Sequence, residues 1–243
     1  MAGVKQKIIG LLGGMGPEST AELLVRITRR TPAATEQDHL RVVIDSNPKI
    51  PNRSDALLDG DLKAVIRALG ETARNLETAG AEVIGIPCNT AHAFLQDVRD
   101  CIDTPVVDMV EETAQQARAA FGEKAIIGLL ATDGTLRTRL YHEALERNSL
   151  QAVGPTSPGV QNAVMDALDT VKLHGVTEES KSAIALAVRD VSEQGAMALI
   201  AGCTEISLIL QKYPPNIPWL DPLTVLAEAL IREATVCDLV EEK

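Results

Sequence analysis

Two cysteines occupy matching places in the sequence, and their side chains could act as acids and bases. Cys88 lies in GIPCNTAH and Cys203 in AGCTE, and a Gly-Ala pair stands eight residues before each of them. Each cysteine follows a short apolar run and precedes a stretch with helical character. The unpaired N–H groups and the dipole at a helix N-terminus favour a thiolate over a thiol. We therefore expect both thiols to have a pKa below the free value of about 8.5, as bases near neutral pH require.

Two such thiols on opposite sides of one ligand could remove a proton from a carbon atom and return a proton to the other face, which is racemisation. The carbanion-like intermediate needs electrostatic stabilisation, and Asn89, Thr90, Thr204 and the helix N-termini could supply it without a cofactor. The simpler alternative is that a cysteine ending a strand is a small buried apolar residue. The matching positions favour a functional pair. Cys101 and Cys237 lack this context, and we expect them to be structural.

The matching positions are part of a longer internal repeat. The run IIGLL occurs at 8–12 and again, letter for letter, at 126–130, an offset of 118 residues. The two cysteines are offset by 115 residues, and TPVVD at 104–108 matches IPWLD at 217–221 with an offset of 113. Three matches in the same order at nearly the same offset predict two similar halves.

Short runs rich in Ile, Val and Leu alternate with longer segments of helical period, the pattern of parallel sheets covered by helices, so the fold class is α/β. The predicted strands are Lys7–Leu12, Arg41–Asp45, Glu82–Pro87, Pro105–Val107, Ala125–Leu130, Leu150–Val153, Met197–Ala201 and Pro218–Leu220. The clearest predicted helices are Ser19–Arg30, Asp61–Ala79, Asp108–Ala120 and Ser180–Glu193, with Gly80, Gly122 and Gly195 as C-terminal stops.

These elements predict two pseudo-symmetric lobes, each an open parallel sheet flanked by helices, with an active site in the cleft between them. Residues 1–103 and 214–243 are expected to form the first lobe and residues 104–213 the second. The final strand and helix, after Tyr213, would then return to the first half. Ligands of parallel sheets bind beyond the carboxyl ends of the strands, so both cysteines would reach the cleft.

Composition limits the kind of ligand. The net charge is −11 and only 2% of residues are aromatic, which argues against nucleic-acid binding. No apolar run approaches the roughly 18 residues of a membrane span. The four cysteines have no zinc-site spacing and no secretory leader precedes them, so we expect a cytoplasmic protein without a metal. An anionic ligand would have to be held by local cations or by helix N-termini.

Several further segments could line such a site. GGMGPEST at 13–20 fits neither the dinucleotide nor the ATP loop and is expected to bring backbone, with Met15, close to a small substrate. The hydroxyls of ATDGT at 131–135 could bind a carboxylate or could only cap a helix. Arg53, in the loop IPNRSD, and Lys172, near an element end, could hold substrate carboxylates in an otherwise acidic protein.

Two residues beside the cysteines have two open interpretations each. His92 follows Cys88 by one helical turn and could tune that thiol or be an ordinary helix residue. Glu205 follows Cys203 by two residues and could orient that thiol or favour a helix N-terminus. The remaining histidines, His39, His142 and His174, have no metal-ligand spacing and are given no role.

On IIGLLGGMGPEST, PCNTAH, ATDGT and GCTE, in this order, the whole chain resembles the aspartate/glutamate racemases that work without pyridoxal phosphate, and among them the aspartate racemases. The resemblance implies a two-lobed α/β fold, a homodimer, no cofactor, and Cys88 and Cys203 as the acid/base pair, one deprotonating each enantiomer. The candidate substrate-binding residues are Met15, Arg53, Asn89, Thr90, Thr132, Thr135, Lys172, Thr204 and Glu205.

The expected substrate is a small dicarboxylic amino acid. GGMGP replaces the Asp-Ser of glutamate racemases, and Glu205 stands where their histidine follows Cys-Thr, so aspartate is favoured and glutamate is a second possibility. One alternative is a related two-cysteine enzyme, such as a hydantoin racemase or a maleate cis-trans isomerase. The other is a non-catalytic protein of this fold that binds a small anion.

Overall fold

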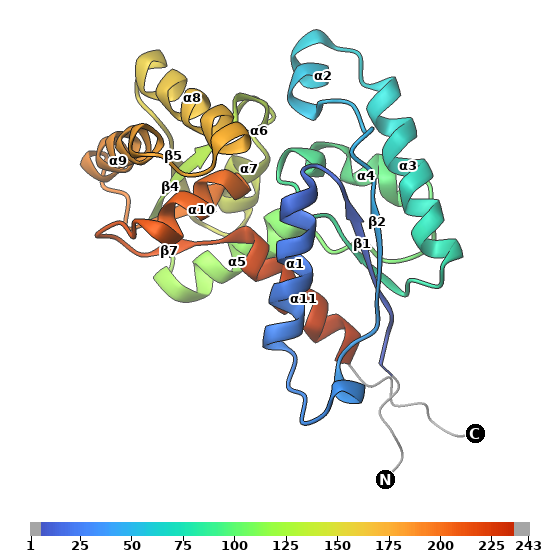
Figure 1. Cartoon of the computed structure of the whole chain (residues 1–243). Helices are drawn as coiled ribbons and strands as arrows, with labels where there is room; N and C mark the ends of the chain where they lie inside the picture. Colours follow the sequence, from blue (N-terminus) through green and yellow to red (C-terminus); the bar gives the residue numbers. More distant parts are fainter. Residues whose placement is uncertain (1–5, 236–243) are drawn as a thin grey trace.

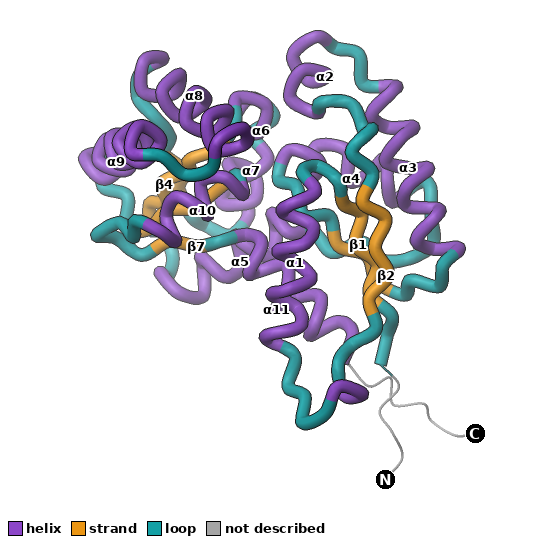
Figure 2. Tube along the Cα trace, in the orientation of Figure 1, coloured by secondary structure: helices purple, strands orange, loops and turns teal. Residues whose placement is uncertain are grey.

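A computed structural model describes residues 6–235 of the chain; Cys237, expected to be structural, lies outside the described residues. Helices pack around two separate groups of strands (Figures 1 and 2). The strands are β1 (Ile9–Gly13), β2 (Val42–Ser46), β3 (Val83–Gly85), β4 (Ile126–Ala131), β5 (Gln151–Val153), β6 (Ala198–Gly202) and β7 (Trp219–Leu220). The α-helices are α1 (Pro17–Arg30), α2 (Arg53–Asp59), α3 (Lys63–Thr78), α4 (Leu95–Arg99), α5 (Met109–Phe121), α6 (Asp133–Arg137), α7 (Leu140–Arg147), α8 (Pro158–His174), α9 (Glu178–Glu193), α10 (Thr204–Lys212) and α11 (Pro222–Thr235), and short 3₁₀ helices span Glu36–Asp38 and Thr90–Phe94.

The two sheets repeat the same strand order. The first sheet runs β2-β1-β3 and the second β5-β4-β6-β7, and all pairs are parallel. An isolated parallel bridge between Ile84 and Val106 extends the first sheet as β7 extends the second. The internal repeat and the α/β class are therefore confirmed. The strand expected at Pro105–Val107 is reduced to that single bridge.

Burial on both faces explains the continuous apolar strands. Every residue of β1, β3 and β6 is buried. The covering helices bury one stripe each; in α3 the stripe includes Val65, Leu69, Ala73 and Leu76. Each fully buried large aliphatic side chain contributes about 1.5–3 kcal/mol. None of the helices between residues 6 and 235 is long and apolar enough to span a bilayer.

The last helix of each half packs on the other half. Helix α5 follows Val106 of the first sheet, yet Val110 and Ala114 of this helix join the second core around Ile127. Helix α11 follows β7 of the second sheet, yet its Leu226 joins the first core with β1. In Figure 1, α11 lies with α1 between the two groups of strands. The two halves therefore exchange helices.

This exchange corrects one expectation. The final helix returns to the first half as expected, but the strand before it does not, because Leu199 and Ile200 of β6 pair with Trp219 and Leu220 of β7. The strands therefore pair within their own half of the repeat, and the chain crosses to the first half only after β7, with α11. The division into 1–103 with 214–243 and 104–213 remains a prediction.

Candidate active site

Cys88 lies just beyond the carboxyl end of β3 and before the 3₁₀ helix Thr90–Phe94. Cys88 is 8% exposed and packs with Phe94 in an apolar cluster of the first half, distinct from the cluster that contains Leu226. The α-helical N-terminus that was expected to favour a thiolate here is only a short 3₁₀ helix. Burial and the loop geometry, rather than a helix dipole, therefore define the surroundings of Cys88.

His92 holds the Cys88 loop in place through two hydrogen bonds to the backbone. The N–H of Met109 donates to His92 Nε2 at 3.2 Å, so Nδ1 carries the ring proton and donates it to the carbonyl oxygen of Cys88 at 2.9 Å. Burial lowers the pKa of His92, and the attraction of Asp108 does not compensate. The ring is therefore a neutral brace between the Cys88 loop and the start of α5, bonded to the backbone of Cys88.

Cys203 is the N-cap residue of α10 and is partly exposed. Its Sγ donates to Glu205 Oε2 at 2.8 Å, and Thr204 Oγ1 donates to the same oxygen at 3.1 Å. Burial of the thiol, followed by the negative charge of Glu205, raises the pKa of Cys203 well above its ordinary value, although Lys172 opposes this. The expectation of a lowered pKa is therefore wrong for Cys203, because burial of the thiol and then the adjacent carboxylate outweigh the helix N-terminus.

Three threonine hydroxyls from the two halves meet near Cys88. Thr90 Oγ1 lies 3.3 Å from Thr132 Oγ1 and 3.0 Å from Thr135 Oγ1, and the last two are 3.1 Å apart. Thr132 also caps α6 by accepting from the N–H of Thr135 at 3.2 Å. The capping interpretation of the ATDGT segment is confirmed, and the capping hydroxyl also belongs to a buried cluster. Binding of a carboxylate by these hydroxyls stays a prediction.

Asn89, a predicted site residue, is hydrogen-bonded to Tyr141, which the sequence did not point to. The hydroxyl of Tyr141, on α7, donates to Asn89 Oδ1 at 2.5 Å. Tyr141 is fully buried, and burial raises the pKa of its hydroxyl far above the ordinary value. Tyr141 is therefore a fixed neutral donor that orients the amide next to Cys88.

Arg53 is the first residue of α2 rather than a loop residue, because Asn52 caps the helix. Its guanidinium donates to the carbonyl oxygens of Met15 at 3.3 Å and Pro51 at 3.1 Å, while Nε is buried without a partner in the described chain. Helices α2 and α6 approach closely, since a Cβ on Gly134 would lie 3.0 Å from Ser54 Cα. Arg53 therefore lies beside Met15 and near the Thr132–Thr135 segment.

Lys172 and Glu205 belong to a second group of charged residues. Lys172 Nζ binds Asp169 Oδ1 at 2.9 Å, and this attraction, with that of Glu205, raises the pKa of Lys172 although burial opposes it. A cavity of about 190 Å³ opens beside them between α1, α8 and α10. The lining residues are Gly16, Pro17, Glu18, Ser19, Glu22, Arg26, Val171, Lys172, Thr204, Glu205, Ser207, Leu208 and Leu223.

The cavity joins the two halves at the carboxyl ends of β1 and β6. Ser19 Oγ, from the first turn of α1, donates to Thr204 Oγ1 at 2.9 Å. The cavity is lined by the residues that follow Cys203, but neither cysteine is among its lining residues. Sequence reasoning missed Glu22 and Arg26, although they have the spacing of a helical ion pair. Ser19 lies in the GGMGPEST segment that was expected to line the site, but it was not singled out.

The predicted site residues therefore form two groups. Asn89, Thr90, Thr132 and Thr135 gather by Cys88, with Met15 and Arg53 near the last two. Thr204, Glu205 and Lys172 gather by Cys203. Each group contains polar donors next to one thiol, an arrangement that can transfer protons.

Comparison with known proteins identifies the family of the chain. The sequence model of the Asp/Glu/hydantoin racemase family matches residues 12–230. The chain is 26% identical to the broad specificity amino-acid racemase RacX of Bacillus subtilis, over 92% of this chain and 96% of that protein. The structure of Picrophilus torridus aspartate racemase is similar with a TM-score of 0.80 and 30% identity over 94% of both chains.

Glutamate racemase RacE1 of Bacillus anthracis shares the fold, with a TM-score of 0.64 and 19% identity over 93% of this chain and 80% of that one. The two-sheet architecture is thus common to racemases of both kinds. The family resemblance read from the sequence is confirmed: the chain belongs to the Asp/Glu/hydantoin racemase family.

Proposed function

We propose that this racemase interconverts L- and D-aspartate without pyridoxal phosphate, with Cys88 and Cys203 as its two acid/base groups. The observation that carries the proposal is the 30% identity, over 94% of both chains, to an aspartate racemase. The equivalent positions of the two cysteines, beyond β3 and β6, support a two-thiol mechanism.

In one direction, Cys203 gives its thiol proton to Glu205, to which it is already hydrogen-bonded at 2.8 Å. The resulting thiolate takes the α-proton of one enantiomer, and the thiol of Cys88 delivers a proton to the opposite face. Cys88 is left as a thiolate, and the reverse reaction starts from that state. Because its pKa is raised, the Cys203 thiolate is rarer at neutral pH but is a stronger base once it has formed.

The substrate carboxylates are assigned to the two groups of polar residues. The hydroxyls of Thr90, Thr132 and Thr135 and the unpaired Nε–H of Arg53 can donate to the α-carboxylate. Lys172, in the cavity wall beside Glu205, can pair with the side-chain carboxylate. Donors held in place before the reaction stabilise the developing negative charge without reorganisation.

A broader substrate range is the second candidate, because of the charges on the cavity wall. Glu18, Glu22 and Glu205 line the cavity, whereas its two cations, Arg26 and Lys172, already bind carboxylates of the protein. An acidic wall favours amino acids with neutral or cationic side chains. The relative from Bacillus subtilis that matches over nearly its whole length is named as broad in specificity.

The test is to incubate the purified protein separately with L-aspartate, L-glutamate, L-alanine and L-lysine in deuterated water without pyridoxal phosphate. Chiral chromatography measures the D-enantiomer and NMR measures deuterium at Cα. D-aspartate with Cα deuterium is the expected result. Turnover of alanine or lysine but not aspartate would favour the broad-specificity candidate. No exchange with any amino acid would reject both and leave the hydantoin, maleate and small-anion-binding alternatives.

A further inference from the structure

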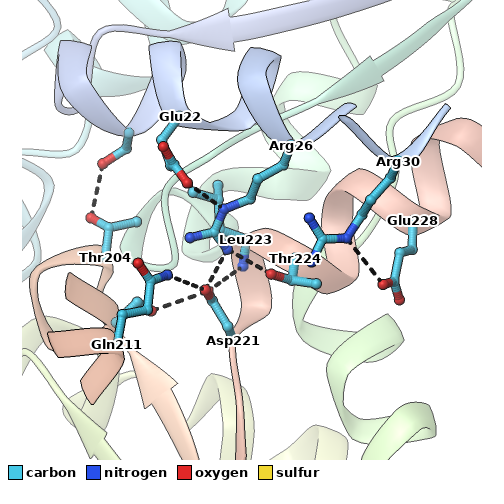
Figure 3. A network of polar contacts seen from close by, with 11 residues as sticks. Glu22, Arg26, Arg30, Thr204, Gln211, Asp221, Leu223, Thr224 and Glu228 are labelled. Carbon is cyan, nitrogen blue, oxygen red and sulfur yellow. Dashed lines mark hydrogen bonds and ion pairs between the residues drawn. The ribbon is translucent and has the colours of Figure 1, made fainter. Parts of the chain in front are cut away.

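A buried ion pair joins distant parts of the chain next to the cavity. Arg26 lies on α1 with its side chain 6% exposed, and its Nη1 binds the carboxylate of Asp221, whose side chain is 8% exposed. The same guanidinium donates from Nε to Glu22 at 2.9 Å and from Nη1 to Thr224 at 2.7 Å. Figure 3 shows these contacts converging between α1 and the start of α11.

The carboxylate of Asp221 also binds α10. Ser207 Oγ donates to this carboxylate at 3.0 Å. Gln211 Nε2 donates to it at 3.4 Å and the N–H of Leu223 at 3.1 Å (Figure 3). Ser207 lies one turn after Cys203 on the same helix. One carboxylate therefore ties α1, α10 and α11 together.

A second contact joins α1 to α10 at the start of both helices, where Ser19 donates to Thr204 at 2.9 Å. The cavity lies between the two contacts, because Ser19, Arg26, Thr204 and Ser207 all line it. Helix α10 is therefore held against α1 at two points. Its first turn, which carries Glu205, cannot rotate without breaking one of them.

Stability alone does not explain a buried pair. Replacing a buried ion pair by apolar residues of similar volume is often neutral or stabilising, because both charges must be desolvated. Burial opposes the charge on Arg26, but Asp221 and Glu22 raise its pKa, so the guanidinium stays charged. What the pair supplies is a set of directional hydrogen bonds that fix three helices in one arrangement.

We infer that Arg26 and Asp221 form a positioning pair that holds the first turn of α10 so that Cys203 and Glu205 face the site. This inference rests on the proposed function, in which Cys203 is one of the two bases. The pair acts through α10 and is given no contact with the substrate.

The test is the double variant Arg26→Met/Asp221→Asn. Both charges are removed together, so no unpaired buried charge remains, and Asn keeps an oxygen for the Ser207 hydroxyl. The matched control is Arg30→Met/Glu228→Gln, which removes an exposed ion pair between α1 and α11. This pair is 3.4 Å long, and its side chains are 39% and 49% accessible.

Two measurements are made on each variant. The first is kcat and KM for the racemised amino acid. The second is the rate at which iodoacetamide alkylates Cys203, measured by peptide mass spectrometry with the partly exposed Cys101 as the internal reference. Alkylation needs no turnover. A wild-type protein that racemised nothing would reject the proposed function and would still allow the positioning role to be tested.

In the double variant we expect kcat to fall about tenfold or more, since a shift of about 1 Å in a reacting group costs up to about 100-fold, while KM changes little. Alkylation of Cys203 should rise several-fold as the first turn of α10 loosens, and that of Cys101 should not change. Arg26→Lys, which keeps the charge but not the forked geometry, should show a smaller loss of kcat. The control should match the wild type.

A purely structural pair would give a different result. A lower melting temperature, with kcat and the alkylation rate of Cys203 both within twofold of the wild type, would overturn the inference, as would equal changes in the control. If the double variant does not fold, Ser207→Ala removes the shorter of the two hydrogen bonds from α10 to Asp221 and leaves the ion pair in place. Faster alkylation of Cys203 in Ser207→Ala supports the positioning role, and an unchanged rate overturns it.

Discussion

The two cysteines occupy equivalent places in the repeat but have different surroundings. Cys88 is enclosed by apolar side chains and by neutral donors, including His92 and the Thr90 hydroxyl. Cys203 is bonded to a carboxylate, Glu205, and lies near the charge of Lys172. The repeat has therefore kept the backbone frame while the electrostatics of the two thiols have diverged.

The residues one helical turn after each cysteine differ in the same way. His92 and Ser207 both stand four residues after a cysteine, and both contact the start of the helix that crosses to the other half. His92 accepts from the N–H of Met109, whereas Ser207 donates to the carboxylate of Asp221. A neutral brace supports the first thiol, and an ionic one supports the second.

The strongest test of the comparison between Cys88 and Cys203 is whether racemisation needs both thiols. Cys88→Ala and Cys203→Ala should each lower the rate of racemisation by about 10²–10⁴-fold, the usual contribution of a general acid or base. Racemisation is followed by chiral chromatography. Cys101→Ala, in the same lobe as Cys88, should keep nearly full activity. Full activity in either of the first two variants would contradict a two-thiol mechanism.

Glu205→Gln tests how much the charge of Glu205 contributes to the raised pKa of Cys203. The Glu205 carboxylate helps raise the pKa of Cys203, so removing its charge should lower that pKa and shift the pH profile of Cys203 alkylation to lower pH. Loss of the proton acceptor should also lower kcat about 10–100-fold, at the lower end of the range for acid/base groups. An unchanged alkylation profile would show that burial alone sets the pKa.

Tyr141→Phe tests the neutral hydrogen-bond donors around Cys88. It leaves Asn89 Oδ1 buried without its donor, which should cost about 1–3 kcal/mol of unfolding free energy in urea titrations. The activity of the remaining folded enzyme should fall, since Asn89 is oriented by this bond. Tyr213→Phe, whose hydroxyl binds the exposed Glu178, is the control and should change stability little. Equal losses in both variants would argue against a special role for Tyr141.

The neutral brace also predicts a dependence of stability on pH. The pKa of His92 is lower in the folded protein than in the unfolded chain. As pH falls below about 6.5, His92 is therefore protonated in the unfolded chain while it is still neutral in the folded protein. His92 should therefore destabilise the protein progressively below that pH, by at most about 1.4 kcal/mol per pH unit. The difference in unfolding free energy between wild type and His92→Gln, measured at pH 7.5 and 5.5, isolates this contribution.

Local patterns were sufficient for much of the fold. Continuous apolar runs located β1, β3, β4 and β6, and the left-handed glycines Gly80 and Gly195 ended α3 and the α9 segment as expected. The partner of a helix is a different matter. The apolar stripe of α5 or α11 shows that the helix is buried, but it does not show against which of two similar sheets.

The site was predictable to a similar depth. The cysteines, their polar neighbours and the hydroxyl segment were found from motifs, because each occupies one short stretch of chain. The pKa of Cys203 was misjudged, because the backbone argument left out the burial of the thiol and the carboxylate of Glu205 two residues later. The pairing of Arg26 with Asp221 joins residues 195 positions apart and could not be read from either segment alone.

The exchanged helices bear on how the chain folds. Each sheet is covered by a helix that the chain reaches only after passing through the other half, as Leu226 on the first core and Ala114 on the second show. A fragment that ended before α11 would leave an apolar face of its first sheet open to water. The two lobes should therefore melt in a single cooperative transition, and gene fragments encoding one lobe should fail to give a stable domain.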